Sequence, residues 1–143
     1  MPGANEQNMG SAPQDLDELR YIHQVYQNQY QVVSNSINIE LQELQQLNMA
    51  QKSLESSELM NEKEILTNVG GDVYMRSKIS DAKSAIIGIG GGYLIEKDVD
   101  ASKNYIAKWI ERKTESINKL IKNKRELEAA LIDIAYKIDK ASR

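Results

Sequence analysis

Two long stretches of the chain carry apolar side chains at steps of three and four and contain neither Gly nor Pro. In residues 16–63 the repeat passes through two sets of positions spaced by seven, which are Leu16, His23, Tyr30, Ile37, Leu44, Gln51 and Leu19, Tyr26, Val33, Glu40, Leu47, Leu54. In residues 98–143 it passes through Ile106, Ile110, Lys113, Ile117, Leu120, Lys124, Leu127, Leu131, Ile134, Ile138 and Ala141. This alternation is typical of a coiled-coil seam, so it predicts two long helices that pair with each other. The core of an ordinary helix bundle is the alternative.

The net charges of the two stretches favour pairing as well. Residues 1–63 hold nine acids and three bases, whereas residues 98–143 hold eight acids and eleven bases. Opposite net charges suit two helices that lie side by side. With the fold-back centred near residue 82, facing residues should have position numbers that add to about 164. This register would place Glu40 opposite Lys124 and Gln51 opposite Lys113.

Residues 64–97 follow a period of two instead, which predicts strands. Val73, Met75, Ser77 and Ile79 alternate with more polar positions, and Gly70-Gly71 is a suitable turn after a short partner strand at 64–67. Residues 84–97 form two further apolar runs that are separated by Gly90-Gly91-Gly92. We therefore expect two β-hairpins between the helices.

Two isolated hairpins bury too little apolar surface to be stable alone. No helix remains to cover them, so we expect β-structure from other subunits to do so. The residues predicted to form this subunit-assembly surface are Val73, Met75, Ile79, Ile86, Ile87, Ile89, Leu94 and Ile95.

Composition removes most kinds of catalytic site. The chain has no Cys, which excludes disulfides and Cys-based metal sites, and its only His, His23, cannot form a multi-histidine metal site or serve a Ser/His/Asp triad without partners placed beside it. The glycine cluster does not match a nucleotide loop, because Tyr93 stands where GxGxxG requires its third glycine. We expect no catalytic residue, no metal and no cofactor. His23 is interpreted as a seam residue, and Trp109 as packed near the hairpins.

The net charge of −3 and the isoelectric point near 5.3 argue against nucleic-acid binding. The longest apolar run is too short for a membrane span, and the N-terminus lacks the features of a secretory signal, so a cytoplasmic location is expected. At 143 residues the chain has room for one domain. We divide it into a disordered tail at 1–14 and a single domain at 15–143, with helix at 15–63, hairpins at 64–97 and helix at 98–143.

The order helix, two hairpins, helix resembles the alpha class of the prefoldin family. The residues that carry the resemblance are Gly70, Gly71, Val73, Tyr74, Lys78 and Ile79 in the first hairpin, and Gly88, Gly90 to Tyr93, Glu96 and Lys97 in the second. The resemblance covers residues 15–143. It implies a mainly α fold, a long antiparallel coiled-coil hairpin with two short β-hairpins at its helix-connecting end, and a β-barrel platform completed by oligomerisation.

The resemblance further implies an ATP-independent holdase of two alpha and four beta subunits that passes unfolded polypeptides to a group II chaperonin. Both chain ends would then lie at the tip of the arm, where apolar residues would contact the client. The predicted client-binding residues are Leu16, Leu19, Tyr21, Ile22, Val25, Ile132, Ile134, Ala135 and Ile138. Ordinary coiled-coil packing at these positions, and a structural filament or tether protein without a client site, are the alternatives.

Overall fold

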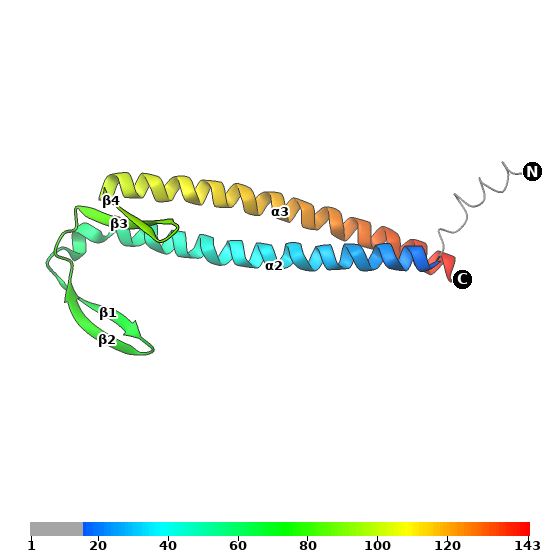
Figure 1. The fold of residues 1–143 in the computed structure, drawn as a ribbon, viewed down its shortest axis with the longest axis horizontal. Helices are drawn as coiled ribbons and strands as arrows, with labels where there is room; N and C mark the ends of the chain where they lie inside the picture. Colours follow the sequence, from blue (N-terminus) through cyan, green and yellow to red (C-terminus); the bar gives the residue numbers. More distant parts are fainter. Residues whose placement is uncertain (1–15) are drawn as a thin grey trace, which may run out of the picture. The chain divides into compact units, whose positions relative to one another are not determined.

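Two long helices flank two β-hairpins in the structure, a computed structural model that describes residues 16–143 (Figure 1). The helices are α2 (Leu16–Glu55) and α3 (Val99–Ala141), and a short 3₁₀ helix, η1 (Ser57–Met60), follows α2. The strands are β1 (Glu64–Gly70), β2 (Val73–Lys78), β3 (Ser84–Gly90) and β4 (Tyr93–Asp98). The predicted mainly α fold with two β-hairpins between long helices is confirmed, and the two sheets of the described chain are open.

The described residues belong to two compact units. One unit contains residues 16–41 of α2 with residues 115–143 of α3, and the other contains residues 42–114 with both hairpins. The tail predicted at 1–14 lies outside the described residues. The division of the chain into this tail and one domain stays a prediction.

In the first unit the opening half of α2 runs antiparallel to the closing half of α3 (Figure 1). Leu19, Ile37, Ile117, Leu127 and Ile134 are buried there. A polar layer crosses the seam as well, because the Tyr30 hydroxyl donates to a Glu128 carboxylate oxygen at 3.1 Å and the Lys124 ammonium lies 5.3 Å from the Tyr30 ring centre.

The predicted seam positions are shielded from solvent. All twelve seam residues of α2 are buried or half-buried, and so are ten of the eleven on α3, the exception being Ala141 at its end. Within the described residues no third helix packs on this stripe. The 3,4 pattern therefore marks a two-helix seam rather than one side of a larger bundle.

In the second unit the start of α3 is fastened to the strand before it. The Asp98 carboxylate accepts a hydrogen bond from the Ala101 backbone N–H at 2.6 Å, which caps the first turn of α3. The Ser102 hydroxyl donates to the Asp98 carbonyl at 2.8 Å and is fully buried. The Val99 N–H donates to the carbonyl of Lys83, the residue before β3, and α3 begins directly after β4 without a loop.

Each hairpin is an antiparallel pair with an irregularity at its turn. Glu64 pairs with Lys78 and Asn68 with Tyr74 in the first hairpin, whereas Ser84 pairs with Asp98 and Gly88 with Leu94 in the second. Asn68 shapes the first turn, because its side-chain oxygen accepts from the Gly70 N–H and its amide donates to the Gly71 carbonyl. The predicted hairpins and their turns are confirmed.

The expected end of the first helix at residue 63 is wrong, since α2 ends at Glu55. The hydroxyls of Ser53, Ser56 and Ser57 donate to backbone carbonyls three or four residues earlier. Serines that bond to the backbone compete with helical hydrogen bonding, and this cluster stops the helix without Gly or Pro. Glu62, whose φ is +62°, then redirects the chain into β1.

The predicted register is also wrong. Lys113 forms an ion pair with Glu43, and their position numbers add to 156 instead of about 164. The position numbers of Tyr30 and Glu128, which are hydrogen-bonded, add to 158. Lys124 was predicted to face Glu40, but its ammonium lies over the ring of Tyr30. The early end of α2 explains the difference, because it moves the centre of the fold-back toward the N-terminus.

We predict that Glu43 and Lys113 stabilise the observed register. The Lys113 side chain is only 15 % exposed and that of Glu43 is 54 % exposed. A double-mutant cycle with Glu43→Gln and Lys113→Met should give a coupling free energy of about 0.5–1 kcal/mol in urea unfolding. The same cycle with the exposed Lys108 in place of Lys113 should give none, and equal couplings would contradict the register.

The turn of the second hairpin should tolerate no side chain at Gly90, whose φ is +102°. We expect Gly90→Ala to cost about 1–3 kcal/mol, because an L residue is strained in this conformation. Gly88→Ala is the matched control, since its added Cβ would make ordinary contact with Leu94 at 3.6 Å. NMR contacts between β3 and β4 should be lost in Gly90→Ala alone, and their persistence would be evidence against the turn.

Candidate binding surfaces

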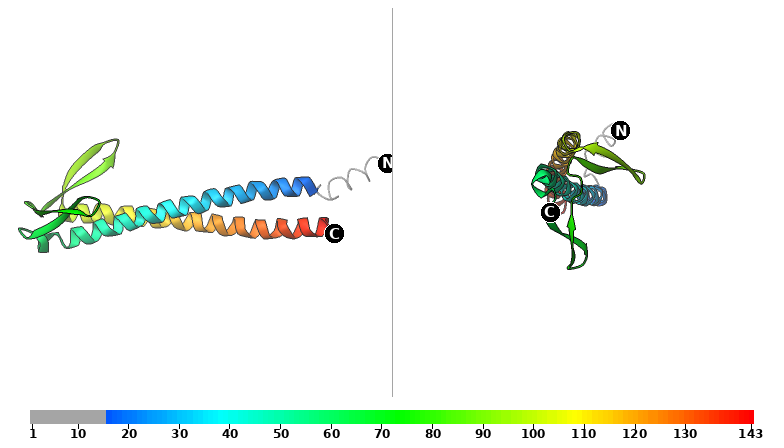
Figure 2. Two further views of the ribbon diagram at one scale, coloured as in Figure 1. Left: turned by 90° about the horizontal axis from the view of Figure 1, so that it is seen from below. Right: turned by 90° about the vertical axis from the view of Figure 1, so that its left-hand side faces the viewer.

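The two hairpins point in different directions in every view, and neither covers the other (Figure 2). Each therefore presents its own faces. Because cross-strand partners lie on the same face of a sheet, the observed pairing tells which side chains share a face.

In the first hairpin one face combines apolar side chains with the hydroxyls of Thr67 and Ser77, which lie within hydrogen-bonding distance of each other. The register pairs Ile65 with Ser77 and Thr67 with Met75, and Val73 of β2 lies on the same face. Val73 and Met75 are 61 % and 60 % exposed. The opposite face carries an ion pair between Glu64 and Arg76 at 3.1 Å. The predicted alternation is present, but nothing in the described chain covers its apolar side.

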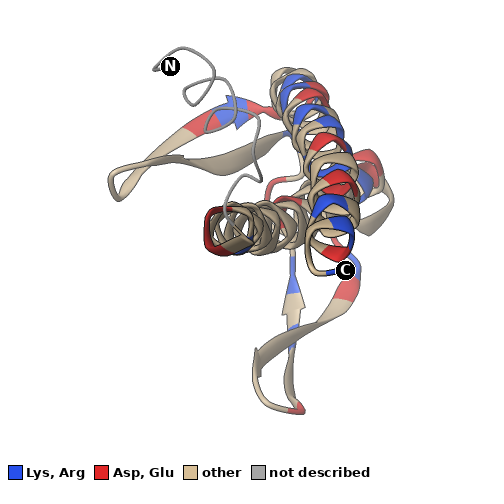
Figure 3. Cartoon of the chain, turned by 90° about the vertical axis from the view of Figure 1, so that its right-hand side faces the viewer, with Lys and Arg blue, Asp and Glu red and all other residues tan. Residues whose placement is uncertain are grey.

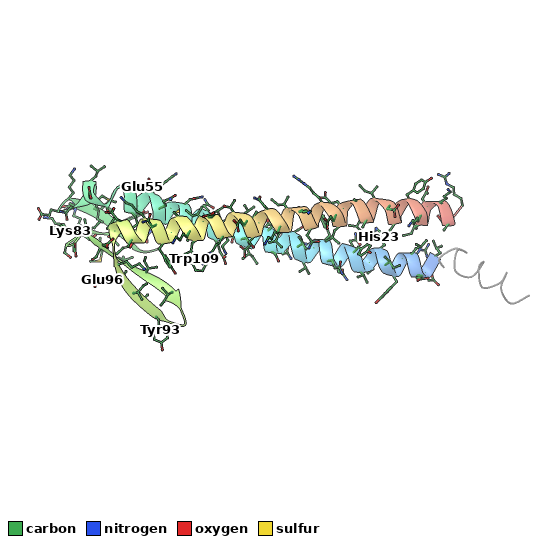
Figure 4. The ribbon with its side chains drawn as sticks, turned by 90° about the horizontal axis from the view of Figure 1, so that it is seen from above. His23, Glu55, Lys83, Tyr93, Glu96 and Trp109 are labelled. Atoms are coloured by element: carbon green, nitrogen blue, oxygen red, sulfur yellow. The ribbon has the colours of Figure 1, made fainter. Side chains whose placement is uncertain are left out.

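In the second hairpin the two faces meet different surroundings. Ile86 and Leu94 lie on the outer face and are 70 % and 68 % exposed. Ile87 and Ile95 lie on the other face and are half-buried. Tyr93 stands at the end of the hairpin and points away from the helices (Figure 4). At its base the Ser84 hydroxyl lies within hydrogen-bonding distance of carboxylate oxygens of Asp81 and Glu96.

A hollow of about 200 Å³ lies between the second hairpin and the helices of the same unit. It is lined by Leu47, Ile87, Gly88, Tyr105, Ile106 and Trp109. The Tyr105 and Trp109 rings are 6.1 Å apart, and the Lys97 ammonium lies 5.5 Å from the Tyr105 ring centre. Trp109 thus lies beside the second hairpin, as its spacing in the sequence indicated (Figure 4).

The residues predicted to bind clients belong to the first unit, where α2 begins and α3 ends (Figure 1). Tyr21 and Ile132 are 70 % and 73 % exposed, and Ala135 is exposed as well. Leu16, Val25 and Ile138 are half-buried.

The other predicted members, Leu19, Ile22 and Ile134, meet at one place. With Tyr26, Ala130, Asp133 and Lys137 they line a hollow of about 230 Å³. Asp133 and Lys137 form an ion pair at 3.1 Å on its rim. Ile22, which was expected to lie outside the seam, therefore contributes to a groove beside it. His23 is half-buried on the side of α2 that faces α3 (Figure 4).

Sequence reasoning missed several exposed apolar residues. Leu66 and Val69 of β1 are 67 % and 54 % exposed, and the face of Leu66 could be assigned only after the pairing register was known. Val32 and Tyr136 are also exposed, as is Ile39. A search of the helices for apolar residues outside the seam would have found them.

Among residues 16–143 no group of three or more His, Asp or Glu side chains is placed to hold a metal ion. No helix in the described part is long and apolar enough to cross a membrane.

Sequence comparison matches residues 14–143 to the model of the family described as "Prefoldin subunit". Prefoldin subunit alpha 1 of Thermococcus kodakarensis is 32 % identical over 72 % of this chain and 71 % of its own length. Prefoldin subunit alpha of Pyrococcus horikoshii is 26 % identical over 90 % of this chain and 88 % of its own length. Probable prefoldin subunit 5 of Dictyostelium discoideum is 26 % identical over 94 % of this chain and 84 % of its own length.

Among solved structures, the filamentous PFD of Methanocaldococcus jannaschii, determined by cryo-EM, superposes with a TM-score of 0.56. The match covers 85 % of this chain and 95 % of that one at 20 % identity. At this level of identity the likeness shows a common fold and nothing further.

Trp109, the only Trp, should report on the hollow beneath the second hairpin. We expect Tyr105→Ala to shift Trp109 emission to longer wavelength and to raise its quenching by acrylamide roughly twofold, because the hollow then opens to water. Lys108→Ala, an exposed neighbour on α3, should change neither quantity. An unchanged spectrum in Tyr105→Ala would show that the hollow does not shield Trp109.

Proposed function

Because this chain belongs to the prefoldin family, we propose that it is the alpha-class subunit of an ATP-independent chaperone in the cytoplasm. In this role it holds unfolded polypeptides and passes them to a group II chaperonin. It catalyses no reaction and uses no cofactor, and its partners are neither nucleic acids nor membranes.

Assembly is proposed to proceed through the hairpins. Two copies would join four prefoldin beta subunits, and strands from neighbouring chains would complete a β-barrel platform. The exposed outer faces of both hairpins support this, since Met75, Ile86 and Leu94 are each 60 % exposed or more in the single chain. Burial of such side chains stabilises association by about 25 cal/mol per Å², and strand pairing satisfies the open edges.

The observation that carries the holdase proposal is the exposed apolar surface at the start of α2 and the end of α3. Tyr21 and Ile132 are 70 % and 73 % exposed, and Tyr136 is 61 % exposed. They are joined in the proposed client-binding set by the half-buried Leu16, Val25 and Ile138, by Ala135, and by Leu19, Ile22 and Ile134 of the adjacent hollow. Contacts of this kind are non-directional, so they select exposed apolar chain rather than a particular sequence.

Each arm would hold a client weakly, and several arms on one complex would raise the effective concentration of binding sites. This explains how retention can occur without nucleotide hydrolysis. Gly91 and Gly92 form the turn between β3 and β4, and together with Gly90 they have positive φ, so these glycines serve the hairpin and not a phosphate. A purely structural filament would not require apolar side chains at the exposed helix ends.

The proposal predicts that charges at the helix ends abolish retention. The complex of this chain with a prefoldin beta subunit should keep a thermally unfolded test enzyme in solution at stoichiometric amounts. Tyr21→Asp combined with Ile132→Asp should raise the concentration needed for half-maximal protection roughly tenfold, because loss of about 1.4 kcal/mol of binding changes affinity by a factor of ten. Light scattering measures the protection.

The matched control is Asp72→Asn, a charge change in the first hairpin turn. Native mass spectrometry should show an intact complex for both variants. A wild-type complex that fails to protect the test enzyme would contradict the holdase function. A double variant that protects fully would contradict the assignment of these residues.

A further inference from the structure

The two hairpins repeat one backbone pattern. Their first strands, β1 and β3, have seven residues each, and their second strands, β2 and β4, have six. Both pairings are irregular at the same place, between Asn68 and Gly70 in the first hairpin and between Gly88 and Gly90 in the second. Every position of the first hairpin therefore has an equivalent in the second, twenty residues later in the chain.

One pair of equivalent faces is uncovered in both hairpins. Cross-strand pairing places Leu66 and Tyr74 on one face of the first hairpin, and it places Ile86 and Leu94 on the equivalent face of the second. All four side chains are more than half exposed. Nothing in the described chain lies on either face, because the helices cover only the opposite side of the second hairpin, where Ile87 lines a hollow.

These two faces carry opposite charges at equivalent positions. Arg76 corresponds to Glu96, and Lys78 corresponds to Asp98. We call the first surface the basic face, which also holds Glu64, and the second the acidic face, which holds no base. In both hairpins the charged segments lie mainly toward the base, and the part nearer the turn is mostly tan (Figure 3). Both faces thus run from a charged base to an apolar end.

The charged groups of both faces can bind further partners. The Arg76 side chain is 80 % exposed, and its ion pair with Glu64 leaves most of its five N–H donors unused. Lys78 forms no ion pair with any residue in 16–143. The Glu96 carboxylate lies within hydrogen-bonding distance of the Ser84 hydroxyl, which neutralises no charge. Each face therefore keeps a net charge that a partner of opposite sign would satisfy.

We propose that the basic face of one copy of this chain packs on the acidic face of a second copy, and that a pair of chains makes this contact twice about a two-fold axis. The proposal rests on assembly through the hairpins and specifies which faces meet. When both bases lie at the same end, equivalent positions stand at the same height. Arg76 then meets Glu96, and the apolar side chains of the two faces meet nearer the turns.

The same charges oppose the other ways of matching the hairpins. Two basic faces would bring Arg76 and Lys78 against their own copies, and two acidic faces would bring carboxylates together. Like charges that meet across an interface weaken binding, so the charge inversion selects the unlike pair. A second copy is the partner that this arrangement favours, because one chain carries both complementary surfaces and a two-fold pair satisfies both.

Two charge reversals, Arg76→Glu and Glu96→Arg, test the contact in the full chain without other subunits. Each variant alone brings like charges together in both contacts of a pair, so sedimentation equilibrium should show dimerisation at least about tenfold weaker than in the wild type. In an equimolar mixture the two changed faces meet each other, and so do the two unchanged faces. The mixture should therefore dimerise within about threefold of the wild-type affinity.

Asp72→Lys is the control, because it reverses a charge in the turn of the first hairpin, outside both faces. It should change the dimerisation affinity by less than about twofold. Mixing cannot repair a hairpin that has lost its own stability, so recovery in the mixture separates a broken contact from a misfolded variant. A wild-type chain that stays monomeric, single variants that dimerise normally, or a mixture that does not recover would overturn the proposal.

The complex with a prefoldin beta subunit separates this proposal from the one on which it rests. If that complex assembles and protects the unfolded test enzyme while the mixture of variants does not recover, only the matching of faces is refuted. If the wild-type chain joins no beta subunit, assembly through the hairpins fails as well. If Arg76→Glu loses the beta subunit in native mass spectrometry but still dimerises normally, the basic face binds that subunit and the proposal is wrong.

Discussion

The seam between α2 and α3 is the interaction on which the rest of the structure depends. An apolar stripe at steps of three and four is narrow, so each helix buries one line of side chains and leaves most of its circumference outside. Leu19, Ile37, Ile117 and Ile134 are buried in this way. The seam occupies most of the apolar helix surface, so the helices cover only the inner face of the second hairpin, where Leu47 and Tyr105 line a hollow with Ile87. The expectation that no helix remains to cover the hairpins is therefore wrong for that face. Both hairpins are consequently left with exposed apolar faces.

Polar residues also make contacts between the two helices. Glu43 and Lys113 meet beside the seam in one unit, and Tyr30 meets Glu128 and Lys124 in the other. Such pairs add little stability at the surface, but a shift by one heptad would separate them. They act mainly to select one alignment. The serines that end α2 at Glu55 act in the same direction, because they set where the chain leaves the seam.

Much of this fold could be predicted because its signals are periodic and local. Heptad positions such as Leu44 and Leu120 identified the seam, and the Gly-Gly pairs identified both hairpin turns. The register was missed because it depends on where α2 ends. The hydroxyls of Ser53, Ser56 and Ser57 set that end by bonding to the backbone. In a sequence, serines are a much weaker signal of a helix end than Gly or Pro.

The candidate surfaces divide in the same way. Tyr21 and Ile132 could be predicted to lie outside the seam from spacing alone. Ile22 was also predicted to lie outside the seam, but its place in the hollow with Ile134 depends on which α3 residues face it. Val69 falls at the irregularity between Asn68 and Gly70, which spacing in the sequence could not show. Features that require two segments to be aligned were therefore inaccessible until the structure supplied the alignment.

The central claim is that the first hairpin and the outer face of the second lack cover within the chain and gain it from partner subunits. Amide hydrogen exchange of β1 to β4 tests this most directly, in the chain alone at a concentration where it is monomeric and again with a prefoldin beta subunit. We expect rapid exchange in the strands of the single chain, slow exchange in the mixture, and little change in residues 16–41 and 115–141. Strands that exchange slowly in the monomer, or equally fast in the mixture, would contradict the claim.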